Sequence, residues 1–166
     1  MYFMKNGDIN VPFYLDVQEE SMMPFSVLYM RRTGAYGPEN HKLMERMKKW
    51  IKESGLYHEQ TVILGISWDD PSVINAGKCR YDVGIVCEKQ EPEYLDDIGR
   101  EQICSGCYVV FLIEHTVEAV QTAWNQCFSA LVGLGFTFDR TRPIIERYQK
   151  KLVDRHCCEL CVPVIK

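Results

Sequence analysis

The 166-residue sequence contains no apolar run long enough to cross a bilayer, and residues 1–20 lack the sustained hydrophobic stretch of a secretion signal. These two absences predict a soluble protein of the cytoplasm. Clusters of basic residues are missing too, because 19 lysines and arginines are dispersed among 23 acidic residues, for a net charge of −4. A phosphate backbone is therefore not an expected direct partner.

Common catalytic and cofactor motifs are also absent. The chain has no G-x-S-x-G elbow, no glycine-rich phosphate loop and no H-E-x-x-H metal motif. The four histidines, His41, His58, His115 and His156, are scattered without metal-ligand spacing. No cofactor and no metal are predicted.

Cysteine is abundant, with eight residues and no secretion signal, which favours free thiols in a reducing compartment. Cys104-x-x-Cys107 and Cys158-x-x-Cys161 together imitate a four-thiolate zinc signature. Only the first pair falls on a turn-like segment. Cys158 and Cys161 are three apart in an expected strand and should point to opposite faces, so buried or half-buried thiols are the default.

The first half of the chain is expected to form a strand, a helix and two strands. An apolar run around Val27 leads through a glycine- and proline-containing turn to a helix over 41–53. Residues 62–68 and 79–87 are rich in β-branched and aromatic side chains, as strands are. The apolar face of the helix carries Leu43, Met44, Met47, Trp50 and Ile51.

The second half repeats this order, with strands expected over 107–115, 143–149 and 157–166. The helix between the first two of these strands has the apolar stripe Val117, Val120, Trp124, Cys127, Phe128 and Leu131.

Matching elements recur at nearly constant spacing: Val27 and Val109 lie 82 residues apart, and Cys79 and Cys157 lie 78 apart. The chain is therefore predicted to be one α+β domain built from two βαββ repeats, about 25–88 and about 101–166, related by a pseudo-twofold axis. A seam between two such halves is a favoured place for a small-molecule cleft.

Four segments, RRTGAYGPE, GISWDDP, KCRYDVGIV and IIERY, resemble the GyrI-like small-molecule-binding domain family over roughly residues 25–165. That family includes gyrase inhibitory protein and the effector-binding domains of AraC- and MerR-type multidrug regulators. The resemblance implies a pair of SHS2-type repeats around a pocket for amphipathic, often aromatic or cationic molecules. It also implies a glutamate at the pocket floor, and Glu146 occupies that motif position. The sequence departs from the family at Cys104-Ser-Gly-Cys107-Tyr108, where members often have Pro-Gly-Gly-Lys-Tyr.

Glu146 is an unusual residue for its position, because Ile144 and Tyr148 share its face of the expected strand. A carboxylate in an aromatic-walled cavity either binds a cation or takes up a proton through a raised pKa. The alternative is an exposed strand glutamate paired with Arg142 or Arg147.

Aromatic residues supply the other candidates for ligand contact. Trp68 ends an expected strand and is either a stacking wall or the last residue of a core stripe. Tyr36, in the turn before the first helix, is either a lid over the cavity or a plug at the helix start. Tyr81 and Phe111 lie on expected inner strands and are candidates to line the same space.

Two sets of helix residues receive simpler interpretations. Trp50 and Trp124 fall on the apolar stripes of their helices and are interpreted as packing. Lys48, Lys49 and Lys52 form a short basic face that is interpreted as solvated.

Three functions follow from the resemblance. The first is a stand-alone domain that senses or sequesters hydrophobic, aromatic or cationic small molecules, since too few residues precede the first family strand for a helix-turn-helix module. The second is a hydrolase that opens the cyclopropane ring of DNA-alkylating compounds. In it, Glu146 activates water, Tyr36 or Tyr148 donates a proton, and Trp68 positions the substrate. The third and weakest is an inhibitor that contacts gyrase.

Overall fold

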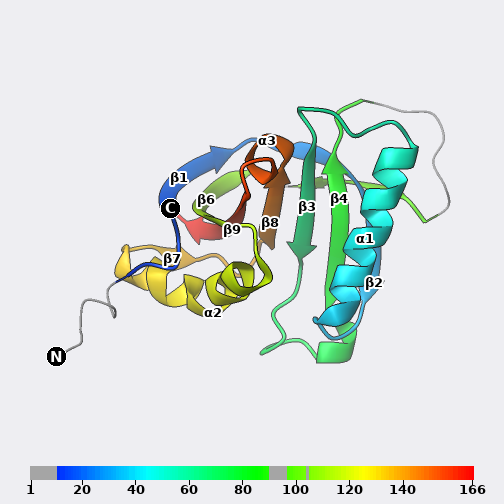
Figure 1. The fold of residues 1–166 in the computed structure, drawn as a ribbon. Coiled ribbons are helices and arrows are strands. Elements are labelled where there is room, and N and C mark those ends of the chain that lie inside the picture. Colours follow the sequence, from blue (N-terminus) through cyan, green and yellow to red (C-terminus); the bar gives the residue numbers. More distant parts are fainter. Residues whose placement is uncertain (1–10, 90–96, 104) are drawn as a thin grey trace.

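A large antiparallel sheet and three α-helices make up the part of the protein that the structure describes, a computed structural model covering residues 11–89, 97–103 and 105–166 (Figure 1). The elements in chain order are β1 (Asp16–Met22), β2 (Phe25–Thr33), α1 (Pro38–Glu53), β3 (Val62–Ser67), the 3-10 turn η2 (Ala76–Lys78), β4 (Arg80–Val86), β5 (Gly99–Ile103), β6 (Gly106–Glu114), α2 (Val117–Gly133), β7 (Thr137–Phe138), β8 (Ile144–Gln149), α3 (Lys150–Val153) and β9 (Cys157–Ile165).

The strands lie in the order β1-β6-β9-β8-β3-β4-β2-β5, and the short β7 pairs with β9. Antiparallel pairing of β3 with β8 joins the strand group β2, β4 and β3 to the strand group β6, β9 and β8. Each group has its central strand last in sequence. The junction between β3 and β8 is therefore the seam of the sheet.

Local sequence explains where the two long helices begin and end. Pro38 opens α1, where its missing N–H costs nothing, and Gly55 follows the helix with a φ of 70°, in the left-handed region that glycine tolerates. At the start of α2, the Thr116 hydroxyl accepts a hydrogen bond from the Ala119 N–H.

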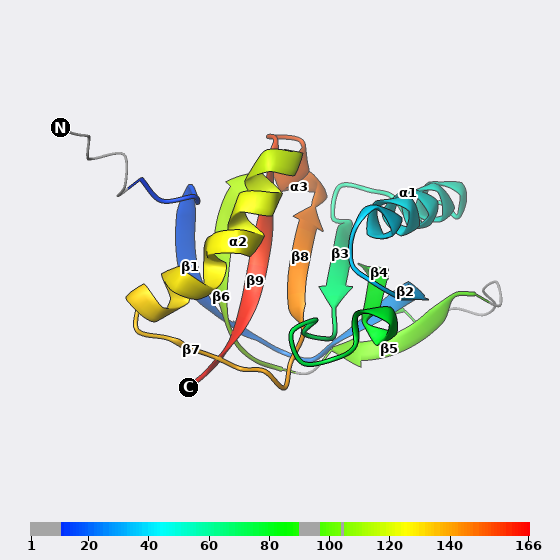
Figure 2. The same cartoon turned by 90° about the horizontal axis from the view of Figure 1, so that it is seen from below.

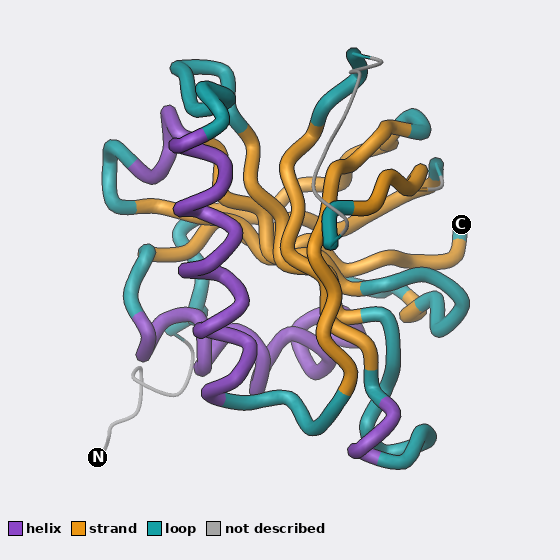
Figure 3. The backbone as a smooth tube through the Cα atoms, turned by 90° about the vertical axis from the view of Figure 1, so that its right-hand side faces the viewer, coloured by secondary structure: helices purple, strands orange, loops and turns teal. Residues whose placement is uncertain are grey.

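Both long helices cover the same face of the sheet. α1 packs on β2 and β4, whereas α2 packs on β6 and β9, so that β3 and β8 run between them (Figures 1 and 2). The strands twist strongly and fan out, as Figure 3 shows. On the face without helices, the curled sheet packs against itself around residues such as Leu64, Tyr108 and Ile145.

The mixed α/β architecture expected from the sequence is confirmed, and every expected strand and helix between residues 25 and 166 is present. The edge strands β1 and β5 were not expected. They extend the sheet by pairing with β6 and β2, respectively. The origin of the two halves by duplication, and their division at residues 25–88 and 101–166, stay predictions. None of the helices in the described residues is both long enough and apolar enough to span a membrane.

Candidate functional site

Glu146 lies on the helix-covered face of β8, at the seam, and its carboxylate accepts three hydrogen bonds. The indole N–H of Trp124, from α2, donates to Oε2 at 2.7 Å. The hydroxyls of Tyr148 and Tyr81 donate to Oε1 at 3.2 and 3.4 Å. Because Tyr81 belongs to β4 and Trp124 to α2, groups from both halves of the sheet converge on one acid.

A glycine makes room for this cluster. Gly65 on β3 pairs directly with Glu146 across the seam. A Cβ atom at Gly65 would lie 2.5 Å from the Tyr81 hydroxyl and 2.8 Å from Glu146 Oε1, both closer than a real contact allows. The missing side chain therefore leaves the space that the carboxylate and the hydroxyl occupy.

The pKa values of the cluster depend on its burial. Loss of solvation raises the pKa of the Glu146 carboxyl, while the hydrogen bonds from Trp124, Tyr148 and Tyr81 act in the opposite direction. Burial, together with the neighbouring Glu146 charge, holds the pKa values of Tyr81 and Tyr148 well above the ordinary value. Both tyrosines are therefore neutral donors at physiological pH.

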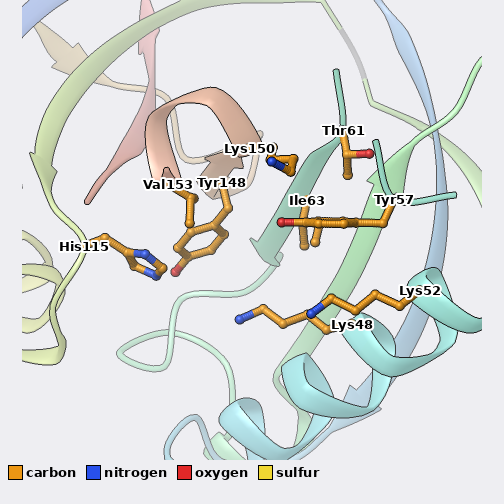
Figure 4. Close-up of a pocket in the computed structure, with 9 residues that line it drawn as sticks. All are labelled: Lys48, Lys52, Tyr57, Thr61, Ile63, His115, Tyr148, Lys150 and Val153. Atoms are coloured by element: carbon orange, nitrogen blue, oxygen red, sulfur yellow. The ribbon is translucent and has the colours of Figure 1, made fainter. Parts of the chain in front are cut away.

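A pocket of about 110 Å³ opens beside this cluster (Figure 4). Tyr148 connects the two, because its ring lines the pocket while its hydroxyl reaches Glu146. The described lining residues come from α1, α3, β3, β8 and the segments next to them: Lys48, Lys52, Tyr57, Thr61, Ile63, His115, Tyr148, Lys150 and Val153. The pocket thus lies over the seam, between α1 and the segment that leads from β6 into α2.

A second hollow, of about 460 Å³, lies on the face of the sheet without helices and is more open. Leu64, Ile145, Arg147 and Glu20 are among the residues that line it. Arg147 is the residue after Glu146 on β8 and points to the opposite face, so this hollow is separated from the Glu146 carboxylate by the sheet.

Tyr36 lies next to the cluster with its hydroxyl already engaged. The hydroxyl donates to the backbone oxygen of Arg80 at 2.7 Å and accepts from the Asp69 N–H at 3.1 Å. Its ring centroid is 6.2 Å from that of Tyr81. Tyr36 therefore ties the turn before α1 to the end of β3 and the start of β4, and Tyr81 lies between Tyr36 and Glu146.

The structure does not bring Trp68 or Phe111 to Glu146. Trp68 packs with the core of the face without helices, and its indole N–H donates to Asp82 Oδ2 at 2.7 Å. Phe111 is completely buried beneath α2, where Phe13 and Tyr14 contact its ring. Of the six candidate ligand contacts, Glu146, Tyr148 and Tyr81 form one cluster.

Two interpretations of helix residues are incomplete. Trp124 does pack against the core, but it also donates the shortest hydrogen bond to Glu146. Its place on an apolar stripe concealed this role, since periodicity shows the direction of a side chain and not its partner. Lys49, which is 76% exposed, and Lys52 are solvated as expected, whereas Lys48 is half-buried; in addition, Lys48 and Lys52 line the pocket.

The cysteines of the described residues are free thiols. Cys158 packs in the helix-side core and Cys161 in the core of the other face, as strand alternation predicts. Cys104 lies outside the described residues. Among those that are described, no group of three or more His, Cys, Asp or Glu residues is arranged to hold a metal ion.

Trp68 belongs to a buried charge cluster on the face without helices. Its partner Asp82 is fully buried and accepts two hydrogen bonds from Arg31, at 2.7 and 2.8 Å. Arg31 also lies 3.5 Å from Glu101. Burial raises the pKa of Glu101 to about 8, and the hydrogen bond and charge of Asp82 add to this effect.

This cluster predicts a pH-dependent stability. Between about pH 4.5 and about pH 8, the folded protein keeps a proton at Glu101 that the unfolded chain releases, so the free energy of unfolding falls as pH rises. The variant Glu101→Gln should lack this fall and exceed the parent by about 1–2 kcal/mol above about pH 8. Urea unfolding across this pH range measures the difference, and parallel profiles for the two proteins would contradict it.

The sequence and the fold of this chain both have matches among known proteins. The family model of the GyrI-like small molecule binding domain matches residues 15–165. The chain therefore belongs to the family of GyrI-like small-molecule-binding domains.

Particular relatives agree with this assignment. The SPbeta prophage-derived protein YosT of Bacillus subtilis (strain 168) is 40% identical over 146 residues, covering 87% of this chain and 96% of YosT. A DNA gyrase inhibitor of Pectobacterium carotovorum subsp. carotovorum (strain PC1) is 28% identical over 127 residues, covering 74% and 79%. The solved structure of SAV2435 bound to tetraphenylphosphonium superposes with a TM-score of 0.62 at 15% identity, covering 91% and 94%. This last likeness shows the shared fold.

Proposed function

We propose that this domain senses or sequesters hydrophobic aromatic compounds, cationic ones above all, in the pocket at the seam, with Glu146 as its acidic floor. The observation that carries the proposal is the Glu146 carboxylate, which is half-buried and held by three uncharged donors. None of the groups that shift its pKa is a cation. A cationic ligand would supply the missing countercharge, and the rings of Tyr81, Tyr148 and Trp124 would surround it.

The size of the pocket sets a condition on binding. Its volume of about 110 Å³ is below the roughly 300 Å³ at the lower end of pockets for drug-sized ligands. Such a ligand would enter when the long side chains at the mouth, Lys48, Lys52 and Tyr57, rotate outward. The related fold of SAV2435, which was solved with tetraphenylphosphonium, supports a ligand of this kind.

The proposal includes the architecture predicted from the sequence, two βαββ repeats of SHS2 type that share one cleft. The strand groups β2-β4-β3 and β6-β9-β8 support it. Each group is formed along the chain by a strand, a long helix and two further strands, and in each the last of the three strands lies in the middle. In this view, Tyr81 and Trp124 are contributed by different repeats to a single ligand.

Calorimetric titration with tetraphenylphosphonium tests the role of Glu146. The variant Glu146→Gln keeps the shape of the side chain and removes its charge, so affinity should fall by about tenfold. Glu53→Gln, at the exposed end of α1, is the matched control and should bind as the parent does. Equal affinity in the parent and in Glu146→Gln would contradict the proposal.

The two tyrosine hydroxyls on Glu146 also favour a second function, hydrolysis of a strained cyclopropane in a DNA-alkylating compound. Glu146 would take a proton from water, and Tyr148 would donate to the oxygen that gains charge. Mass spectrometry with substoichiometric protein tests it by the addition of water to the compound over several turnovers. Turnover that disappears in Glu146→Gln supports the hydrolase, whereas intact compound leaves binding as the function.

A further inference from the structure

The wall of the seam pocket is basic. Lys48 and Lys52 extend into it from α1, and Lys150 lies across from them at the start of α3 (Figure 4). Among the described residues that line the pocket, none is acidic, because Glu146 lies behind Tyr148 and contacts the hydroxyl of that residue. The charge of this wall is therefore opposite to the charge that a purely cationic ligand would favour.

The three lysines differ in how well they are neutralised. Lys150 contacts two carboxylates, at 2.8 and 3.1 Å, and needs no further partner. The carboxylate nearest to Lys48 is that of Glu45, at 3.7 Å. Lys52 lies 5.3 Å over the ring of Tyr57, and no described carboxylate pairs with it within 4.0 Å.

Lys48 and Lys52 are also unfavourable neighbours. They are four residues apart on α1, where like charges repel each other and destabilise a helix. An anion between their ammonium groups would turn this repulsion into two attractions. The geometry thus resembles a clamp for an acidic group.

His115 lies on the opposite wall, between β6 and α2. Burial lowers the pKa of its imidazole, and the positive charge of Lys48 and the neighbouring His156 lower it further. The ring is therefore neutral at physiological pH, and its centroid lies 5.4 Å from that of the Tyr148 ring, with the two rings tilted by 49°. A neutral imidazole can donate one hydrogen bond to an acid without adding a third repelling charge.

We infer that the ligand of this pocket carries an acidic group, a carboxylate or a similar anion, which lies between Lys48 and Lys52 at the pocket mouth. Tyr57, Tyr148 and Ile63 provide the apolar surface for the aromatic body of the same ligand. The inference rests on the proposed function and narrows it: the compound has a flat or cationic aromatic core that faces Glu146 and an acid that faces α1.

A pair of dyes separates the inference from the proposal on which it rests. A rhodamine with a free carboxylate and the methyl ester of the same dye share one cationic aromatic core and differ only in the acid. Fluorescence anisotropy should show that the free acid binds more tightly. Replacing Lys52 or Lys48 by methionine should weaken binding of the acid about fivefold and leave binding of the ester nearly unchanged.

Lys49→Met is the matched control, because Lys49 is on the same helix but exposed to solvent. It should bind both dyes as the parent does, and thermal unfolding should confirm that all three variants fold. Two results would overturn the acidic-group inference while the proposed function stands. One is equal affinity for the ester and the free acid, and the other is a loss of affinity for the free acid in Lys49→Met as large as that in the Lys48 and Lys52 variants. If neither dye binds, and tetraphenylphosphonium does not bind either, the proposed function itself is wrong.

Discussion

Replacing Arg147 by methionine is expected to lower the free energy of unfolding by about 3–5 kcal/mol, because it leaves a buried carboxylate without its cation. Arg147 donates to both oxygens of Glu159, at 2.8 and 3.0 Å, and to both oxygens of Glu20, at 3.0 and 2.9 Å. Glu159 is only 7% exposed. After the substitution, Glu159 keeps one side-chain partner among the described residues, the amide of Gln149 at 2.6 Å.

Urea unfolding measures this change, and two further variants make the result specific. Arg140→Met removes a pair with Asp70 whose side chains are 71% and 39% exposed, so its cost should stay below about 1 kcal/mol. Adding Glu159→Met to Arg147→Met should restore stability, since the unpaired charge is then removed as well. If Arg147→Met and Arg140→Met lowered the free energy of unfolding equally, the ion pairs of Arg147 with Glu159 and Glu20 would contribute little to stability.

Gly65→Ala is expected to damage stability and ligand binding together. The new methyl group would meet the Tyr81 hydroxyl at 2.5 Å and Glu146 Oε1 at 2.8 Å. Overpacking of this kind costs about 1–3 kcal/mol in a well-packed core. The displaced carboxylate should also reduce affinity for tetraphenylphosphonium by about tenfold, as loss of its charge does.

A second substitution tests the stated cause. Tyr81→Phe removes the atom that the new Cβ would approach most closely, so the double variant should be more stable than Gly65→Ala alone, although each single change is unfavourable. Gly133→Ala is the control, because a Cβ at that position has no neighbour within 4 Å. Additive losses in the double variant would place the strain elsewhere.

Much of the fold follows from local patterns in the sequence. The apolar stripes of the two long helices and the β-branched runs of the central strands are strong signals, because those elements are buried on at least one face. β1 gave no such signal: its sequence, DVQEESM, is mostly polar, and only its pairing with β6 makes it a strand. Polar edge strands depend on a neighbour that local sequence cannot specify.

The candidate site was predictable in part. Strand alternation correctly placed Glu146, Tyr148 and Ile144 on one face, and the structure adds the partners of the acid. Trp68 was misleading because its strand face is apolar, which fits a pocket wall as well as a core stripe. Only the pairing of Gly65 with Glu146 shows that Trp68 and Glu146 lie on opposite faces of the sheet. Trp124 and Lys52 were missed because their roles depend on how the helices lie across the sheet.

The position of β1 also bears on how the chain folds during synthesis. Val17 pairs with Phe111 on β6, so β1 remains unpaired until the strand Gly106–Glu114 has been made. Such long-range pairing is slow, and an unpaired edge can recruit other chains. The acidic side chains of Asp16, Glu19 and Glu20 repel a second copy of the same strand during this interval. We therefore expect the charge on β1 to oppose aggregation of the nascent chain, before Glu20 pairs with Arg147 in the folded domain.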